Sequence, residues 1–130
     1  MNTVRWKQRF ANLEKAYRQF ENATHRDQYD ELSTAGLVQM FEFTFELVWK
    51  TFKDYLEHNG YDEESPRNVI KRCYQLGYLE DGELWLEALE KRNVLAHVYD
   101  ESFAKEAIKL INGKYFSMIS QAFSFLSKAE

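Results

Sequence analysis

LVQMFEFTFELVWKTFKDYL, residues 37–56, is the stretch that decides the fold class of this chain. Its apolar residues recur every three or four positions, which is the spacing of one face of a helix. They are Leu37, Phe41, Phe45, Val48, Phe52 and Tyr55, and Met40, Phe43, Leu47 and Trp49 widen the face. So broad an apolar arc is typical of a central helix, which we expect to run from about Asp30 to Asn59. Gly60 is suited to end it, because glycine adopts the left-handed conformation that closes helices.

The segments on both sides of this stretch carry the same periodicity. An apolar face from Val4 to Phe20 predicts a first helix over about residues 3–24. After the central helix, Ser65 followed by Pro66 has the pattern of a helix N-cap with proline in the first position, and Gly77 can end that short helix.

Two further helices complete the chain. Asp81 can cap one that ends near His97, and Asp100 can cap a final helix whose spacing continues through Gly113. With short connections and no strand pattern, the sequence predicts an all-α fold, an up-and-down four-helix bundle with one additional short helix. We expect a single domain over residues 1–130.

Composition limits the classes of function. Apolar residues make up 45% of the chain and charged residues 29%, as in soluble globular proteins, and no apolar stretch is long enough to span a membrane or to act as a secretory signal. The single cysteine, Cys73, excludes a disulfide framework, so we expect a cytoplasmic protein. A net charge of -4 argues against charge-driven binding to any nucleic acid. The many aromatic residues favour self-association.

Several polar features have ordinary explanations. A polar stripe on the central helix is accounted for as a solvated face with one ion pair between Glu46 and Lys50, although a recognition surface stays open. The stripe consists of Gln39, Glu42, Glu46, Lys50, Lys53 and Glu57. It has no histidine-bearing partner of the kind that metal sites in bundles use, so we expect no metal and no cofactor. His25 and His58 lie near helix ends, where a local role is sufficient.

A group of basic residues follows in the third and fourth helices. Arg67, Lys71 and Arg72 give the short helix a basic face, and Lys91 adds a charge next to Arg92. This group is a weak candidate for binding an RNA backbone, because several glutamates flank it.

The stretch RNVLAHVYDE, residues 92–101, carries the chemistry. Arg92 and His97 are five residues apart, so on a continuous helix they would point roughly 140° away from each other. They converge only if the helix ends between them. An imidazole can transfer a proton near neutral pH and a guanidinium can hold a phosphate, which are two parts of a metal-free ribonuclease. A symmetric dimer would supply the second proton-transfer group. From spacing alone, an arginine and a histidine that merely decorate the end of a helix remain an open interpretation.

With the residues in view, the chain resembles the HEPN superfamily, and within it the small proteins described as nucleotidyltransferase substrate-binding subunits or as toxins paired with a minimal nucleotidyltransferase antitoxin. Three stretches carry the resemblance: FEFTFELVWKTFKDYL at 41–56, SPRNVIKRCYQLGYL at 65–79 and WLEALEKRNVLAHVYDE at 85–101. The last contains arginine, four residues, histidine, one residue and tyrosine, which is similar to the family's signature.

The resemblance implies a homodimeric endoribonuclease that acts on RNA without a metal. In it, Arg92 would stabilise the scissile phosphate, His97 would transfer protons and Asn93 would orient either one. Tyr99 would be the residue that the partner nucleotidyltransferase adenylylates to silence the toxin. Two alternatives stay open: a non-catalytic substrate-binding subunit of a two-component nucleotidyltransferase, and a purely structural role for Arg92 and His97.

Overall fold

The computed structural model describes residues 3–95 and 101–129, and across these residues the regular structure is entirely helical. The helices are α1 (Thr3–Ala23), α2 (Glu31–His58), α3 (Pro66–Gln75), α4 (Gly82–Leu95), α5 (Glu101–Leu110) and α6 (Phe116–Lys128), and a π-helical turn, Ile111–Tyr115, joins the last two. The predicted all-α class is therefore confirmed. No helix in the described part of the chain is long and apolar enough to cross a membrane.

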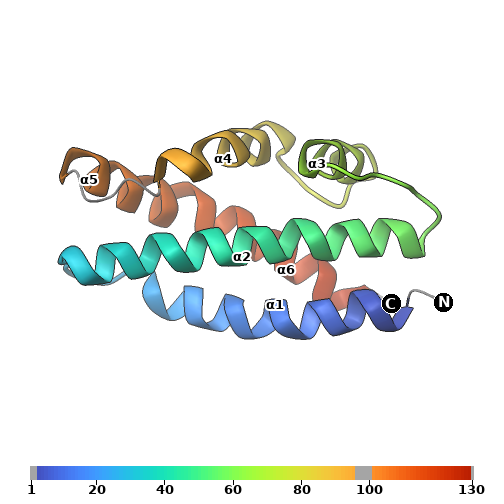
Figure 1. Ribbon diagram of the computed structural model, residues 1–130, viewed down its shortest axis with the longest axis horizontal. Coiled ribbons are helices and arrows are strands. Elements are labelled where there is room, and N and C mark those ends of the chain that lie inside the picture. Colours follow the sequence, from blue (N-terminus) through green and yellow to red (C-terminus); the bar gives the residue numbers. More distant parts are fainter. Residues whose placement is uncertain (1–2, 96–100, 130) are drawn as a thin grey trace.

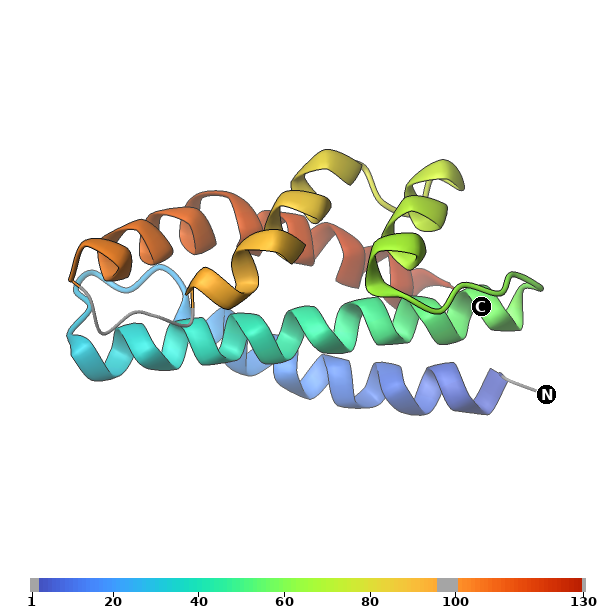
Figure 2. The ribbon, with the colours of Figure 1, turned by 45° about the horizontal axis from the view of Figure 1, so that its top comes forward.

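The helices run up and down around α2. Figure 1 shows α1 antiparallel to α2 along its length, with the continuous α5–α6 segment on another side and both chain ends at the same end of the bundle. The view in Figure 2 shows α3 and α4 together on the remaining side, with α3 as the additional short helix near the C-terminal part of α2. Because α2 is contacted from several sides, it needs the broad apolar arc that its sequence carries.

The core is built on the aromatic residues of α2. Phe41 and Phe45 are fully buried, and each contacts a different neighbouring element. Tyr115 stacks on Phe41 with ring centroids 5.3 Å apart, and Trp85 of α4 lies 5.3 Å from Phe45. These two contacts fix the place of α4 and of the C-terminal segment on α2.

The predicted caps at Ser65 and Asp81 are confirmed, and Asp30, expected only as the start of the central helix, is also a cap. The Asp30 carboxylate accepts a hydrogen bond from the Ser33 backbone N–H at 2.7 Å, and Ser65 and Asp81 accept equivalent bonds at the starts of α3 and α4. Gly60 and Gly77 have φ angles of 91° and 80°, in the left-handed region. The predicted cap at Asp100 lies outside the described residues.

The C-terminal helix differs in one detail from its prediction. The chain stays helical through Gly113, as expected, but residues 111–115 form a π-helical turn. Such a turn holds one extra residue and shifts the faces of the helix that follows it. Here it accompanies two side-chain bonds: Asn112 Nδ2 donates to Tyr29 Oη at 3.0 Å, and Tyr115 Oη donates to Glu87 Oε2 at 2.7 Å.

Candidate functional site

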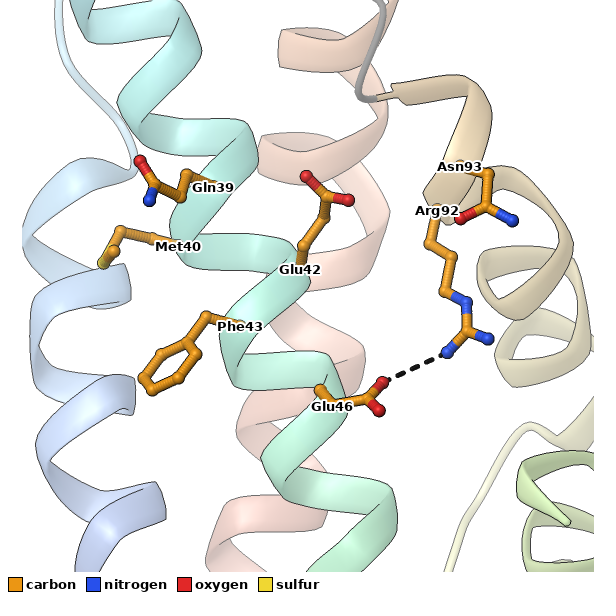
Figure 3. A pocket seen from close by; sticks show the side chains of 7 residues that line it. All are labelled: Gln39, Met40, Glu42, Phe43, Glu46, Arg92 and Asn93. Atoms are coloured by element: carbon orange, nitrogen blue, oxygen red, sulfur yellow. Dashed lines mark hydrogen bonds and ion pairs between the residues drawn. The ribbon is translucent and has the colours of Figure 1, made fainter.

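An open groove of about 600 Å³ lies between α2 and α4. Figure 3 shows that α2 supplies most of its lining and that α4 supplies the arginine and the asparagine. The lining residues are Gln39, Met40, Glu42, Phe43, Glu46, Arg92 and Asn93. The α2 residues recur at helical spacing, so they share one face of that helix.

Arg92 points from α4 toward α2, where Glu46 holds it (Figure 3). Arg92 Nη1 donates to Glu46 Oε2 at 3.2 Å, and the Arg92 side chain is 28% exposed. The same carboxylate accepts a bond from Trp49 Nε1 at 3.0 Å and pairs with Lys50 Nζ at 3.5 Å. Glu46 therefore contacts three polar side chains, and its predicted pairing with Lys50 is confirmed.

The position of Arg92 depends on contacts made earlier in α4. Trp85 is buried against the core, and Glu87 accepts the hydrogen bond from the Tyr115 hydroxyl. Burial, followed by the bond to Glu87 and the negative charges of Glu87 and Glu106, raises the pKa of Tyr115 above its usual range. The phenol therefore stays protonated and continues to donate at neutral pH.

The groove holds two carboxylates beside the guanidinium. Burial raises the pKa of Glu42, and the charge of Arg92 opposes that shift. With Glu46 also present, the described lining contains more acidic than basic side chains. A phosphate would be attracted chiefly at Arg92 itself.

The residues predicted around Arg92 are placed in part. Asn93 is exposed and lines the same groove, as Figure 3 shows. His97 and Tyr99 lie outside the described residues, so their predicted roles, and the predicted end of the helix between Arg92 and His97, stay predictions.

The weak RNA-binding candidates do not join this groove. Arg67 pairs with Glu90 at 3.4 Å, and Arg72 pairs with Glu63 at 2.8 Å. Lys71 lines a second groove, between α3 and α4, that also contains Asp81 and Glu83, and Lys91 is exposed on α4. The two arginines are thus largely neutralised by carboxylates, and their role in RNA binding stays a prediction.

Two features of the groove were not predicted from the sequence. Glu46 was expected only in a solvated stripe, whereas its carboxylate also binds Arg92, which lies 46 residues later in the chain. Phe43 was expected on the apolar face of α2, whereas 54% of Phe43 is exposed. The polar stripe was the available signal, but only the packing of α4 shows which of its members meets a cation.

No group of three or more histidine, cysteine, aspartate or glutamate side chains is placed to hold a metal ion within residues 3–95 and 101–129. Cys73 is buried in the core, and burial raises the pKa of its thiol well above the usual range. It is therefore a packing residue.

The chain is similar to known proteins in sequence and in fold. The family described as nucleotidyltransferase substrate binding protein like matches residues 8–128. A Haemophilus influenzae protein described as probable ribonuclease HepT is 27% identical over 75 residues, which cover 54% of this chain and 51% of that protein. The match thus spans about half the length of that relative. A crystal structure of a protein from Thermus thermophilus superposes with a TM-score of 0.81 at 27% identity, covering 89% of this chain and 99% of the other.

Proposed function

The chain belongs to the nucleotidyltransferase substrate binding protein like family, within the HEPN proteins. On this basis we propose that it is the toxin of a toxin–antitoxin pair. We propose further that it is a metal-independent endoribonuclease that acts as a homodimer. The observation that carries the proposal is that the Arg92 guanidinium lies in an open groove, where it is bonded to the carboxylate of Glu46. The similarity to a probable ribonuclease supports it.

Arg92 is suited to bind the scissile phosphate. Its ion pair with Glu46 is partly exposed, with side chains 28% and 40% accessible, and such pairs contribute about 0–1 kcal/mol. A phosphate can therefore replace the carboxylate at little cost. A bidentate guanidinium contact would then stabilise the charge that builds on the phosphate as it reacts.

In this proposal His97 transfers the protons. The imidazole takes the proton of the RNA 2′-hydroxyl, whose oxygen attacks phosphorus, and the bond from phosphorus to the 5′-oxygen breaks. The products are a 2′,3′-cyclic phosphate and a 5′-hydroxyl that receives a proton from the His97 of a second copy. This second requirement is the reason for the homodimer. Asn93, exposed beside Arg92, would orient one of the reacting groups.

Tyr99 would be the regulatory residue. Transfer of AMP to its hydroxyl by a partner nucleotidyltransferase adds bulk and a negative charge two residues from His97, where an RNA phosphate must bind. The modified toxin would be silent.

A second function, a non-catalytic substrate-binding subunit of a two-component nucleotidyltransferase, is favoured by the family's own description. The net charge of -4 and the acidic side chains in the groove also fit weak affinity for RNA. Under this function, transfer by the partner to a separate substrate would depend on this chain.

The decisive experiment measures cleavage of RNA with EDTA present for three proteins: wild type, His97→Ala and Arg92→Ala. We expect the two variants to lose at least about a hundredfold in kcat, since each removes a proton-transfer group or a phosphate ligand. Lys15→Ala is the control, because Lys15 is an exposed lysine on α1 and lies outside the groove. Full cleavage by a folded, dimeric His97→Ala protein would contradict the proposal.

The regulatory part is tested separately. Co-expression with the partner nucleotidyltransferase, followed by intact mass and peptide mapping, should show an AMP-sized addition on Tyr99. Transfer by the partner to another molecule, with Tyr99 unmodified and no RNA cleaved, would favour the binding subunit instead.

A further inference from the structure

Phe43 is an aromatic side chain that the proposed chemistry does not use. Most rings of the chain pack into the core, and the neighbouring Phe41 and Phe45 are fully buried. Phe43 is 54% exposed and lines the groove that contains Arg92. Exposing a phenyl ring costs hydrophobic free energy, so a ring held beside a binding groove is a candidate contact for a partner.

The spacing on α2 relates Phe43 to Arg92. Phe43 lies three residues before Glu46, so the two side chains are neighbours one turn apart. Glu46 in turn binds the Arg92 guanidinium at 3.2 Å. Figure 3 shows the Phe43 ring on the side of α2 that faces away from α4, with Glu42 and Glu46 between it and Arg92, Gln39 above it on α2 and Asn93 across the groove on α4.

The charges select what can lie between the ring and the arginine. Glu42 and Glu46 repel a second phosphate. An RNA strand with one phosphate bound at Arg92 must therefore place an uncharged group over the part of the groove next to Phe43. A nucleobase is uncharged and has a face that stacks on a phenyl ring. The amide of Gln39, on the same helix as Phe43, offers both a donor and an acceptor to the edge of such a base.

The proposed homodimer brings the His97 of a second copy to the phosphate at Arg92, so that copy lies along one side of the groove. A copy that covered the whole groove would bury Glu42, Glu46 and the partly exposed Arg92, and the desolvation of three charged groups opposes such coverage. A single base over the ring leaves these groups in water.

We propose that Phe43 is a stacking residue for an unpaired base of the RNA substrate, next to the nucleotide whose phosphate is bound by Arg92. This inference rests on the proposed ribonuclease function. It adds a requirement to that function: the base must be free to leave its own stack, so cleavage falls in single-stranded RNA and not within a duplex.

The test compares Phe43→Leu and Phe43→Trp with wild type on a single-stranded oligonucleotide. Leucine keeps apolar bulk but has no ring, so kcat/KM should fall about 5- to 150-fold, the range of a lost base–aromatic stack. Tryptophan should retain or improve the wild-type value. If Phe43→Leu cleaves as well as wild type, the inference is overturned.

An abasic substrate separates stacking from other effects. When the base next to the cleaved bond is removed, wild type and Phe43→Leu should cleave equally, because the base that the ring contacts is gone. A persistent deficit of the leucine variant on the abasic RNA would assign Phe43 to folding or assembly. Tyr74→Leu is the matched control, since Tyr74 is 53% exposed but lines the groove between α3 and α4. An equal loss in that variant would also overturn the inference.

Oligomeric state gives the remaining alternative. Light scattering should give the same mass for wild type and Phe43→Leu across the assay concentrations. A smaller mass for the variant, with activity restored at high protein concentration, would make Phe43 a contact between copies and overturn the stacking role.

Binding without cleavage distinguishes failure of this inference from failure of the proposed function. The probe is a 2′-deoxy-blocked oligonucleotide with 2-aminopurine next to the blocked bond, whose fluorescence is quenched when the base stacks. Quenching by wild type and not by Phe43→Leu supports the subsite even if no RNA is ever cleaved. Cleavage by wild type without Phe43-dependent quenching refutes the subsite and leaves the ribonuclease intact. Displacement of the oligonucleotide by an equal concentration of free AMP would assign the groove to a mononucleotide instead.

Discussion

Replacing Tyr115 with phenylalanine tests how α4, and with it Arg92, is held on the bundle. Tyr115 is fully buried, stacks on Phe41 and donates its hydroxyl proton to Glu87 Oε2 at 2.7 Å. Phenylalanine keeps the ring and its stacking and removes only the hydroxyl. The variant therefore isolates the one hydrogen bond between the π-helical turn and α4.

The expected loss follows from the type of bond. A hydrogen bond to a charged group contributes about 1.5–3 kcal/mol, and water can reach the half-buried Glu87, so we expect about 1.5 kcal/mol less free energy of unfolding at neutral pH. For a chain of 130 residues the unfolding entropy near the midpoint is about 0.27 kcal/mol/K. The melting temperature should therefore fall by about 6 °C.

The pH dependence provides an independent check. Burial and Glu87 raise the pKa of Tyr115 above the value of about 10 that it has in the unfolded chain. Below about pH 10 both states keep the proton and the stabilisation is complete. Above it the unfolded state loses the proton while the folded state holds it, so wild type loses stability as the pH rises. Because phenylalanine at this position cannot titrate, the difference between the two proteins should shrink as the pH rises above about 10.

Urea unfolding followed by tryptophan fluorescence measures both effects. Glu87→Met, which has no acceptor oxygen at this position, completes a mutant cycle with the double variant. The coupling between the two positions should be about 1 kcal/mol, since contacting residues are not additive. A Tyr115→Phe protein with unchanged stability at every pH would refute the role of this bond in holding α4. A loss that is equally large when Tyr115→Phe is made in the Glu87→Met protein would show that the hydroxyl acts through another partner.

Two further predictions concern other ion pairs. Glu46→Gln should change the melting temperature by less than about 3 °C, because the pair with Arg92 is partly exposed. The same variant should lower KM for RNA about threefold at low salt, because it removes a negative charge near the bound phosphate. A rise in KM would mean that Glu46 orients Arg92 and does not compete with RNA for it. Arg9→Met should cost at least about 2 kcal/mol in urea unfolding, because among the described residues it leaves the buried Asp54 carboxylate, 2.7 Å from Arg9, with Arg5 at 3.8 Å as its one remaining cation. Arg5→Met, at a 58% exposed position, should cost less than about 0.5 kcal/mol, and equal losses in the two variants would contradict this division.

Local chemistry explains why much of the fold was predictable. The caps at Asp30, Ser65 and Asp81 involve backbone groups within three residues of each side chain, so the sequence pattern contains the whole interaction. The left-handed glycines at the ends of α2 and α3 are equally local. The π-helical turn was not predictable, because it accompanies side-chain bonds from that segment to residues far away in the chain.

The same distinction between local and long-range contacts applies to the candidate site. The stretch from Arg92 to Tyr99 suggested a phosphate ligand, a proton-transfer group and a modifiable phenol from residue types and order alone. The groove in which Arg92 lies was not visible in that pattern, because most of its lining comes from α2.

The sequence by itself therefore determined an all-α bundle around the helix of residues 31–58, because apolar periodicity and caps are short-range properties. The packing of the helices, in contrast, sets the bond between Glu46 and Arg92 and leaves Phe43 exposed at the other edge of the groove. The physical reason is that both outcomes depend on where α4 packs across α2. That placement comes from the contacts of Trp85 and Glu87 with residues far away in the chain.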